Sequence, residues 1–167
     1  FTLSGVISNG GVNLTAGTLQ LSNAVNTYAG ATTVAASASS NNFANTLILG
    51  GGLPNTSSLT VGAYGGLSGD GGSVGTVNSN GLVTIAANAK VNPGGGNGGA
   101  NNSTIGTLTF NNGLTAQADS ILRYDISSAT TADKLVVNGT LDVSDATLSL
   151  NLGSFTPSPN NSFTLID

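Results

Sequence analysis

The sequence contains no cysteine, histidine, tryptophan, methionine or glutamate, and only 6% of its 167 residues are charged. Without cysteine the chain has neither a disulfide framework nor a thiolate metal site. The missing histidine removes the commonest general base, and the missing cysteine removes the usual thiol nucleophile. We therefore expect a protein that is not an enzyme and that holds no cofactor or metal.

Charge and hydropathy exclude two further kinds of partner. A net charge of −4 and a pI near 4.1 leave no basic face for nucleic acid, because the only cations are Lys90, Arg123 and Lys134. No apolar run approaches the ~20 residues of a membrane-spanning helix. The chain starts at Phe1 without a signal-like segment, and we expect it to be a fragment of a longer protein.

Large side chains are also scarce: aromatic residues make up 5% of the chain, whereas glycine contributes 25 residues. A single large core usually relies on several rings that each bury about 150–250 Å². The interior of this protein must instead be built from Leu, Val, Ile, Ala and Thr. Such small, uniform side chains suit a thin core that is repeated layer after layer.

The hydrophobic pattern has a period of two, in short runs separated by Gly and Asn, and it predicts an all-β protein without helices. The expected strands are Val12–Thr15, Thr18–Leu21, Thr32–Val34, Thr46–Leu49, Ser58–Val61, Leu82–Ile85, Lys90–Val91, Thr107–Phe110, Ile121–Ile126, Lys134–Val137, Thr140–Val143, Thr147–Leu152 and Ser162–Ile166.

A degenerate internal repeat narrows the architecture. The string Thr-Leu-x-apolar follows a turn residue in Gly17–Leu21, Asn45–Leu49, Gly106–Phe110 and Gly139–Val143, with a looser copy in Ser58–Val61. The Leu and the apolar residue two positions later point to the same face of a strand, so stacked copies would form a continuous interior column. The repeat predicts a β-solenoid with Gly or Asn at its corners, because both residues tolerate positive φ.

Asn-Gly pairs keep an alternative fold open. They begin at Asn9, Asn80, Asn97, Asn112 and Asn138. In isolation each pair is a strong signal for a two-residue hairpin, as in an antiparallel β-sandwich. In a solenoid the same pairs mark corners, and the repeat favours this interpretation.

We expect residues 1–167 to form one solenoid segment. Residues 1–91 hold the N-terminal coils, 92–104 a flexible Gly/Asn-rich loop and 105–167 the C-terminal coils. With about 20 residues per coil and about 4.8 Å between coils, the rod would have about eight coils and a length of about 40 Å. Stacked Asn side chains can form hydrogen-bonded ladders along such a rod.

Several strings resemble one known family. Asn26–Val34, read as Asn-Thr-Tyr-Ala-Gly-Ala-Thr-Thr-Val, is similar to the Asn-Thr-Tyr-x-Gly-x-Thr-x-Val signature of autotransporter-associated β-strand repeats. The family's Gly-Thr-Leu-x-Leu-Ser and apolar-x-Pro-Gly elements resemble Gly17–Ser22 and Val91–Gly94, and its closing coils resemble Asp133–Val143 with Ala146–Leu150. The resemblance implies a right-handed parallel β-helix that is exported across a Gram-negative outer membrane or displayed on a similar surface.

The carboxylates are the main candidates for chemistry, and all seven are Asp. Asp119, Arg123 and Asp125 form the best grouping, in which Arg123 and Asp125 share a strand face and are expected to make a surface ion pair worth about 0–1 kcal/mol. Asp142 and Asp145 flank a turn, which we expect them to cap rather than to bind Ca²⁺. A polysaccharide lyase would need several Asp around a Ca²⁺ ion, so these residues do not predict catalysis.

The remaining polar and aromatic candidates favour plain structural roles. Asp70 lies in a Gly-rich turn that does not match the Ca²⁺-binding nonapeptide repeat. Tyr28, Tyr64 and Tyr124 would stack on sugars only if exposed, and Tyr28 is expected to pack at a corner. We assign no residue to a catalytic, cofactor-binding or metal-binding site.

The expected function is structural or adhesive. Our first hypothesis is an extracellular β-helical passenger segment on a bacterial cell surface, acting as a rigid stalk with a host or cell-surface glycan or protein as partner. The alternative is a self-assembling subunit of an extracellular filament or matrix, because low charge and uncapped strand edges favour association into fibres. A polysaccharide-active enzyme is a third and much weaker hypothesis.

Overall fold

The computed structural model describes residues 1–38, 43–53, 55–69, 74–77, 82–95 and 104–167, and within these ranges the protein is all-β, with no helix. The described ranges accordingly hold no helix long and apolar enough to cross a membrane. The strands are β1 (Thr2–Leu3), β2 (Val12–Leu14), β3 (Thr18–Leu21), β4 (Thr32–Val34), β5 (Thr46–Leu49), β6 (Leu59–Val61), β7 (Gly66–Gly69), β8 (Val74–Val77), β9 (Val83–Ile85), β10 (Lys90–Asn92), β11 (Thr107–Phe110), β12 (Leu114–Ala116), β13 (Ile121–Ser128), β14 (Thr131–Ala132), β15 (Lys134–Val137), β16 (Leu141–Asp142) and β17 (Thr147–Asn151).

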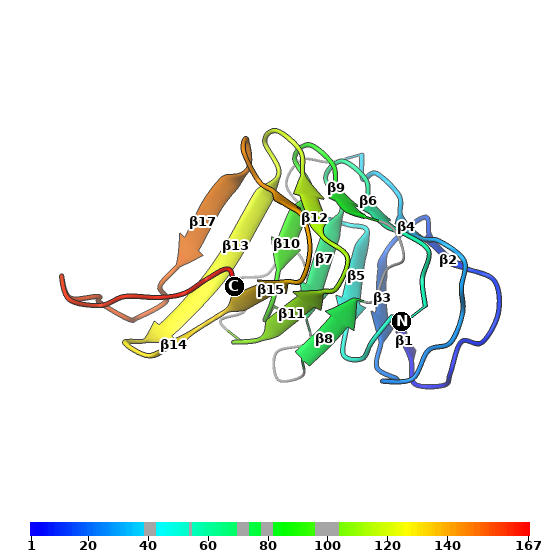
Figure 1. Ribbon diagram of the computed structural model, residues 1–167, viewed down its shortest axis with the longest axis horizontal. Helices are drawn as coiled ribbons and strands as arrows, with labels where there is room; N and C mark the ends of the chain where they lie inside the picture. Colours follow the sequence, from blue (N-terminus) through cyan, green and yellow to red (C-terminus); the bar gives the residue numbers. More distant parts are fainter. Residues whose placement is uncertain (39–42, 54, 70–73, 78–81, 96–103) are drawn as a thin grey trace.

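The strands form three sheets that follow the order of the chain. The long sheet runs β1-β3-β5-β7-β10-β13-β14, with β17 also paired to β13 (Figure 1). The six-stranded sheet runs β2-β4-β6-β9-β12-β16, and the three-stranded sheet runs β8-β11-β15. Each strand therefore lies beside the next strand of its own sheet along the chain.

Among the described strand pairs, thirteen are parallel and one, β13 with β14, is antiparallel. Parallel neighbours cannot be joined by a two-residue hairpin, because the chain must return to the same end of the sheet. The pairing does not fit the antiparallel β-sandwich that the Asn-Gly pairs left open.

The step from one strand of the long sheet to the next varies in length. The step from Thr2 to its partner Gln20 is short, whereas the step from Lys90 to its partner Ile121 is the longest in the sheet. Most steps exceed the length of about 20 residues that a regular coil would have. The long sheet consequently has seven parallel strands from β1 to β17 rather than the eight layers expected from the repeat. Longer steps enlarge the connections and leave the spacing of the strands unchanged.

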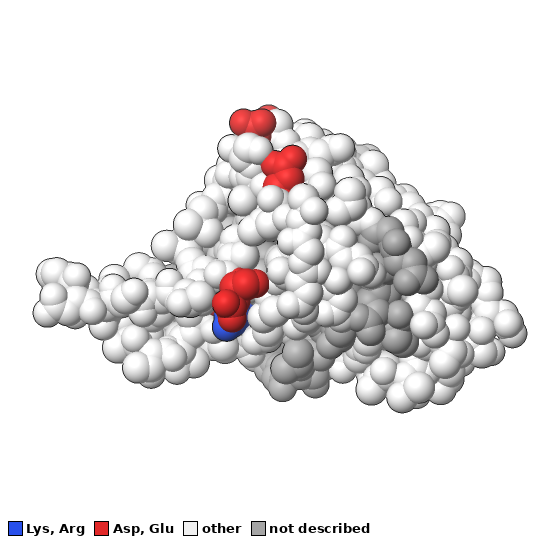
Figure 2. Space-filling model, viewed as in Figure 1, with Lys and Arg blue, Asp and Glu red and all other residues white. Residues whose placement is uncertain are grey.

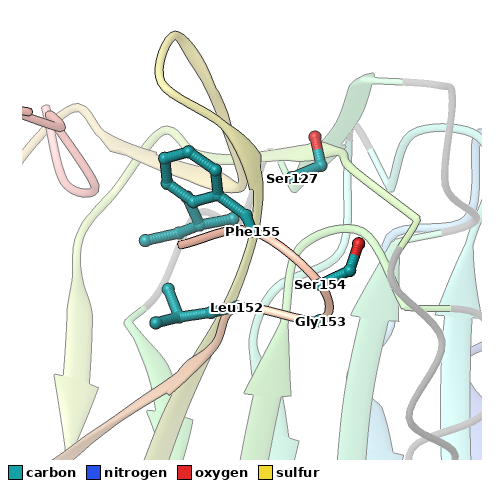
Figure 3. Close-up of a pocket in the computed structure, with 6 residues that line it drawn as sticks. Ser127, Leu152, Gly153, Ser154 and Phe155 are labelled. Atoms are coloured by element: carbon teal, nitrogen blue, oxygen red, sulfur yellow. The ribbon is translucent and has the colours of Figure 1, made fainter. Parts of the chain in front are cut away.

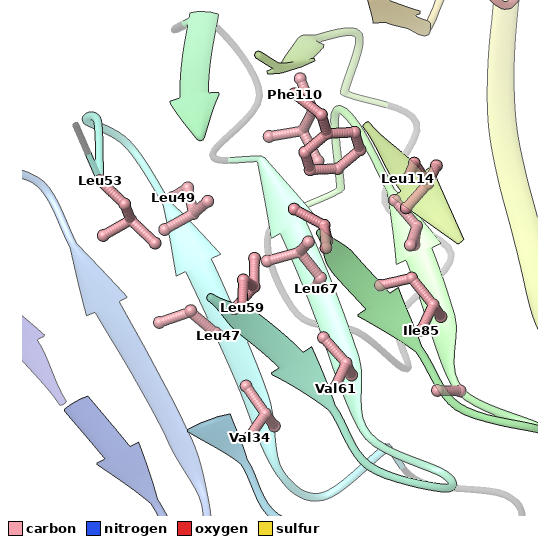
Figure 4. Packing of buried hydrophobic residues seen from close by; sticks show 14 of the residues in the cluster. Val34, Leu47, Leu49, Leu53, Leu59, Val61, Leu67, Ile85, Phe110 and Leu114 are labelled. Carbon is pink, nitrogen blue, oxygen red and sulfur yellow. The ribbon is translucent and has the colours of Figure 1, made fainter. Parts of the chain in front are cut away.

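The apolar core is a column between the sheets (Figure 4). Leu47 and Leu49 of β5, and Leu108 and Phe110 of β11, are completely buried. The two apolar positions of the Thr-Leu-x-apolar string therefore do point inward, as predicted from its spacing. The last copy differs: Leu141 of β16 is 39% exposed, because β16 is the final strand of its sheet and no described strand lies beyond it.

Glycine and asparagine occupy corners between the sheets, as expected. Gly10, Gly113 and Gly139 have φ of 75°, 100° and 139°, in the region that favours glycine. Asn112 and Asn138, each just before such a glycine, lie where β11 and β15 of the three-stranded sheet lead into β12 and β16 of the six-stranded sheet. The pairs that begin at Asn80 and Asn97 lie outside the described residues.

Twelve of the thirteen expected strands are present within one or two residues of their predicted bounds. The thirteenth, Ser162–Ile166, is reduced to a single parallel bridge between Leu135 and Ile166. The sequence pattern does not predict β1, β7, β8, β12 or β14, and β7 is the clearest case, since glycine lacks strand propensity. This strand forms because its neighbours β5 and β10 pair with it on both sides.

Candidate functional site

One face of the long sheet gathers two of the chain's three cations. Lys90 and Asn92 lie on β10, and Arg123 and Asp125 lie on the adjacent β13. The residues that alternate with them belong to the apolar core, so these four side chains point to the opposite face of the sheet. Ser68 of β7 is level with Asn92 on the same face. We call these five residues the covered polar face.

The covered polar face is almost fully shielded from solvent. Lys90 is 5% exposed, and its Nζ lies 4.1 Å from the centroid of the Phe43 ring, a cation–π contact. The Thr46 hydroxyl donates a hydrogen bond to the backbone carbonyl of Phe43 at 2.6 Å. The chain just before β5 is thereby held over Lys90.

The ion pair predicted between Arg123 and Asp125 is present, with Nη2 and Oδ1 3.2 Å apart, but its expected surface position is wrong. The two side chains are only 10% and 0% exposed. The Asn151 amide of β17 also donates a hydrogen bond to Asp125 Oδ1. A buried pair carries a desolvation cost that a surface pair does not, and its partners depend on each other much more strongly.

A second buried carboxylate, Asp133, ties this face to the neighbouring corner. Its Oδ2 accepts a hydrogen bond from the backbone N–H of Asp125 at 2.9 Å, and its Oδ1 accepts one from Gly106 at 2.7 Å. The N–H of Gly94 is a third donor to this carboxylate. Asp133 therefore joins β13 to the two chain segments that flank residues 96–103.

Burial shifts the pKa of two of these groups. Loss of hydration raises the pKa of Asp133 to about 6, against the lowering effect of its backbone hydrogen bonds. Loss of hydration also lowers the pKa of Lys90 to about 8, and the nearby Arg123 charge acts in the same direction. Both shifts mean that the folded chain disfavours the charged form of these side chains.

Two polar atoms of the covered polar face lack a hydrogen-bond partner. The amide Nδ2 of Asn92 and the carboxylate Oδ2 of Asp125 are buried and unpaired within the described structure. Asn92 uses its other side-chain atom, since Oδ1 accepts a hydrogen bond from Gly95 N at 3.1 Å. An unpaired buried polar atom costs about 1–3 kcal/mol, so these two atoms require an explanation.

The other acidic residues do not join this face. Asp119 lies in an exposed turn with φ of 62°, whereas Arg123 and Asp125 are buried. Asp142 caps its turn as predicted, because its Oδ1 accepts hydrogen bonds from the backbone N–H and the hydroxyl of Ser144, which hold its pKa below the usual range. Asp145 is exposed, and Asp70 lies outside the described residues.

The tyrosines are packing residues rather than a sugar-stacking surface. Tyr28 and Tyr124 are buried, and Tyr64 is half-buried in a turn with φ of 56°. The Tyr28 hydroxyl lies 2.6 Å from the Thr32 hydroxyl, which in turn lies 2.9 Å from the Thr56 hydroxyl. The corner role expected for Tyr28 from the repeat signature is therefore confirmed.

A small cavity of about 140 Å³ lies between the end of β13 and the chain that follows β17 (Figure 3). It is lined by Ile126, Ser127, Leu152, Gly153, Ser154 and Phe155. The Leu152 and Phe155 side chains lie on one side of this turn of the chain, whereas the Ser127 and Ser154 hydroxyls point away from them. The lining has no charged group, so the cavity offers shape and apolar contact but no acid–base chemistry.

The outer surface is poor in charge. In the view of Figure 2 acidic and basic side chains take up only a small part of the surface. The basic group of the Lys134–Asp167 ion pair, 2.7 Å between Nζ and Oδ2, belongs to a half-exposed contact between β15 and the chain end. The sequence has no Asp, Glu, Lys or Arg before Asp70. In the described ranges no group of three or more acidic residues could hold a metal ion.

The arrangement defines the class of protein: an all-β chain of stacked, mostly parallel strands with a covered polar face on β7, β10 and β13. No family model, no curated protein and no solved structure matches the chain.

Proposed function

We propose that the chain is a segment of right-handed parallel β-helix that serves as a rigid structural or adhesive element outside the cell. The single observation that carries this proposal is the unbroken parallel ladder from β1 to β17, in which six successive pairings join seven strands of one sheet. Such a ladder with a continuous apolar column resists bending, because every layer pairs with the layers on both sides.

The extracellular part of the proposal rests on the resemblance to autotransporter-associated β-strand repeats and on the surface composition. Uncharged Ser, Thr and Asn hold many of the exposed positions of the described residues, and only 6% of all residues are charged. The resemblance suggests a passenger segment that holds an adhesive surface away from the cell. The adhesive partner would be a glycan or a protein of the opposing surface.

Electron microscopy and small-angle scattering of the purified chain test the rigid-rod proposal. We expect one elongated particle, with a maximum dimension that does not change between low and high ionic strength. A globular or flexible particle would contradict the proposal. A pull-down of intact bacteria or host cells with the labelled chain tests adhesion separately, with a heat-denatured sample as control.

A second candidate function, the filament subunit, is favoured by the exposed end of the stack. On β17, Leu148 and Leu150 are 57% and 49% exposed, although they are level with Leu122 and Tyr124, which are buried on β13. Within the described residues β17 pairs with a strand on one side only. An open strand edge beside apolar side chains favours end-to-end pairing with a second copy.

Sedimentation velocity over a concentration series tests the filament candidate. Assembly should grow with concentration and should be abolished by Leu148→Glu, which places a charge on the exposed end. The matched control is Leu19→Glu on β3, inside the long sheet, which should affect stability rather than assembly. A chain that remains monomeric at every concentration would overturn this candidate.

A further inference from the structure

We propose that the outer face of the six-stranded sheet binds ice, through a row of four threonine side chains on neighbouring strands. Strands β4, β6, β9 and β12 lie side by side in this sheet (Figure 1). Each carries a threonine at its centre, and we call Thr33, Thr60, Thr84 and Thr115 the threonine row. The proposal goes beyond the structural or adhesive function and applies to a stalk and a filament alike.

The strand pairing places the members of the threonine row in line. Thr60 is level with Thr33 on one side and with Thr84 on the other. Thr84 is in turn level with Thr115. Neighbouring strands lie about 4.8 Å apart, so the row repeats one hydroxyl and one methyl group at about this step.

The threonine row points away from the apolar core. In each of the four strands the residues on both sides of the threonine are buried, and successive side chains of a strand point to opposite faces. Thr60 is exposed, and the other three threonines are partly exposed. None of the four hydroxyls makes a hydrogen bond with another described residue. All four are therefore available to a partner outside the chain.

The chemistry of the row argues against most other kinds of partner. Asn13 continues the row beyond Thr33, and Asp142 continues it beyond Thr115. Asp142 is the one charged residue among these six, and no cation is present to bind a phosphate backbone. None of the six is an aromatic residue or an arginine, the types enriched in protein interfaces, and no ring offers a stacking platform for sugars. A neutral surface rich in hydrogen-bonding groups is the best match.

Ice offers such a surface, because the water molecules at its face can donate and accept hydrogen bonds. The oxygen atoms of ice repeat at a spacing close to the step between neighbouring strands. A threonine hydroxyl also both donates and accepts, and the branched side chain restricts its own rotation. Several weak contacts made at once by one rigid array add up to firm attachment, because little conformational freedom is lost. A side-chain ladder of this kind also favours a flat sheet, which suits a flat crystal face.

Partition of the intact chain into slowly growing ice tests the proposal. A dilute solution is frozen slowly onto a cooled ice surface, and the protein concentrations of the ice and of the remaining liquid are measured. We expect the ice to take up about tenfold more of this chain than of the variant Thr60→Tyr, whose ring holds the ice away from the middle of the row. Tyrosine suits a strand as well as threonine does, so the variant should fold. The matched control is Thr147→Tyr on β17, an exposed strand position outside the row, which should partition like the unchanged chain.

A second variant, Thr60→Val, keeps the shape and the strand propensity of the side chain and removes one hydroxyl. It should lower the uptake into ice by about threefold, the effect of one lost hydrogen bond. Exclusion of the unchanged chain from ice, unchanged partition of both Thr60 variants, or equal loss in Thr60→Tyr and Thr147→Tyr would overturn the proposal. Binding of the chain to crystalline cellulose or chitin without uptake into ice would also overturn it, because the row would then be assigned to a polysaccharide.

Discussion

The side-chain oxygen of Asn45 accepts a hydrogen bond from the backbone N–H of Gly17 at 3.0 Å, between two segments far apart in the sequence. Both residues directly precede a Thr-Leu strand, and these strands, β3 and β5, pair with each other. The Asn45 amide also donates to the carbonyls of Thr15, Ala35 and Ala36, at 3.1–3.3 Å. One buried Asn thus lies within hydrogen-bond distance of four backbone groups at a corner, and its two N–H bonds are shared among the three carbonyls.

Replacement of Asn45 by Ala should lower the free energy of unfolding by about 2–3 kcal/mol, because it leaves buried backbone groups without partners. Urea denaturation followed by circular dichroism measures the change. The control is Asn13→Ala on β2, an exposed position, which should change stability by less than about 0.5 kcal/mol. Equal effects of the two variants would contradict a special role for Asn45.

Removal of one partner of the buried ion pair should be more harmful than removal of both. Asp125→Ala leaves the Arg123 guanidinium without its carboxylate in a buried site, and we expect a loss of about 3–5 kcal/mol. The double variant Arg123→Met with Asp125→Leu should recover most of this loss. A double-mutant cycle, measured by denaturation, gives the interaction free energy between the two side chains. Additive effects of the two substitutions would show that the side chains do not stabilise each other.

The sequence predicts the strands well and the coverage of their outer faces poorly. The period-two pattern and the Thr-Leu strings identify β3, β5 and β11 to the residue, because the inward positions must be apolar. The pattern does not reveal that Lys90 lies under the Phe43 ring, because that contact depends on a connection much earlier in the chain.

The same limit explains the wrong position given to the Arg123–Asp125 pair. Alternation places both side chains on one face of β13, and this inference is confirmed. Alternation carries no information about what packs against that face, so charged residues are assigned to the surface by default. Leu141 shows the opposite error, since its pattern predicts burial but the final strand lacks a covering layer.

Stability should depend on pH on both sides of neutrality. Asp133 has a pKa of about 6 in the folded chain, above its ordinary 3.8, so the folded state binds its proton more tightly. The contribution of Asp133 to stability is then complete below about pH 4 and is lost as the pH rises through about 6. Lys90 has a lowered pKa of about 8, so stability should rise again between about pH 8 and 10.5.

Thermal denaturation between pH 4 and 10 measures this profile, whose minimum should lie between about pH 6 and 8. The charged group that acts on Asp133 is Asp125, and it reinforces the rise in pKa. Asp142 and Asp167 have lowered pKa values and act only below about pH 4. Asp133→Asn should flatten the acidic side alone, and an unchanged profile would refute the assignment.

The corners should tolerate no added side chain where two layers touch. A Cβ at Gly30 would lie 2.3 Å from the carbonyl oxygen of Gly10, which already accepts a hydrogen bond from Gly30 N. Gly30→Ala should therefore destabilise the fold by about 1–3 kcal/mol. Gly5→Ala, where nothing lies within 4 Å, should be neutral or stabilise by up to about 1 kcal/mol. Denaturation of both variants decides whether the corners are stacked this closely.

Because each parallel strand of the long sheet pairs only with the strands that come just before and just after it in that sheet, no pairing there ties the two ends of the chain together. Folding can then nucleate in any layer and propagate to the layers on both sides. Amide exchange should be slowest in β5, β7 and β10, which have neighbours on both sides, and fastest in β1 and β17. Under a pulling force applied at its termini, the molecule would peel strand by strand and yield in small steps rather than in a single rupture.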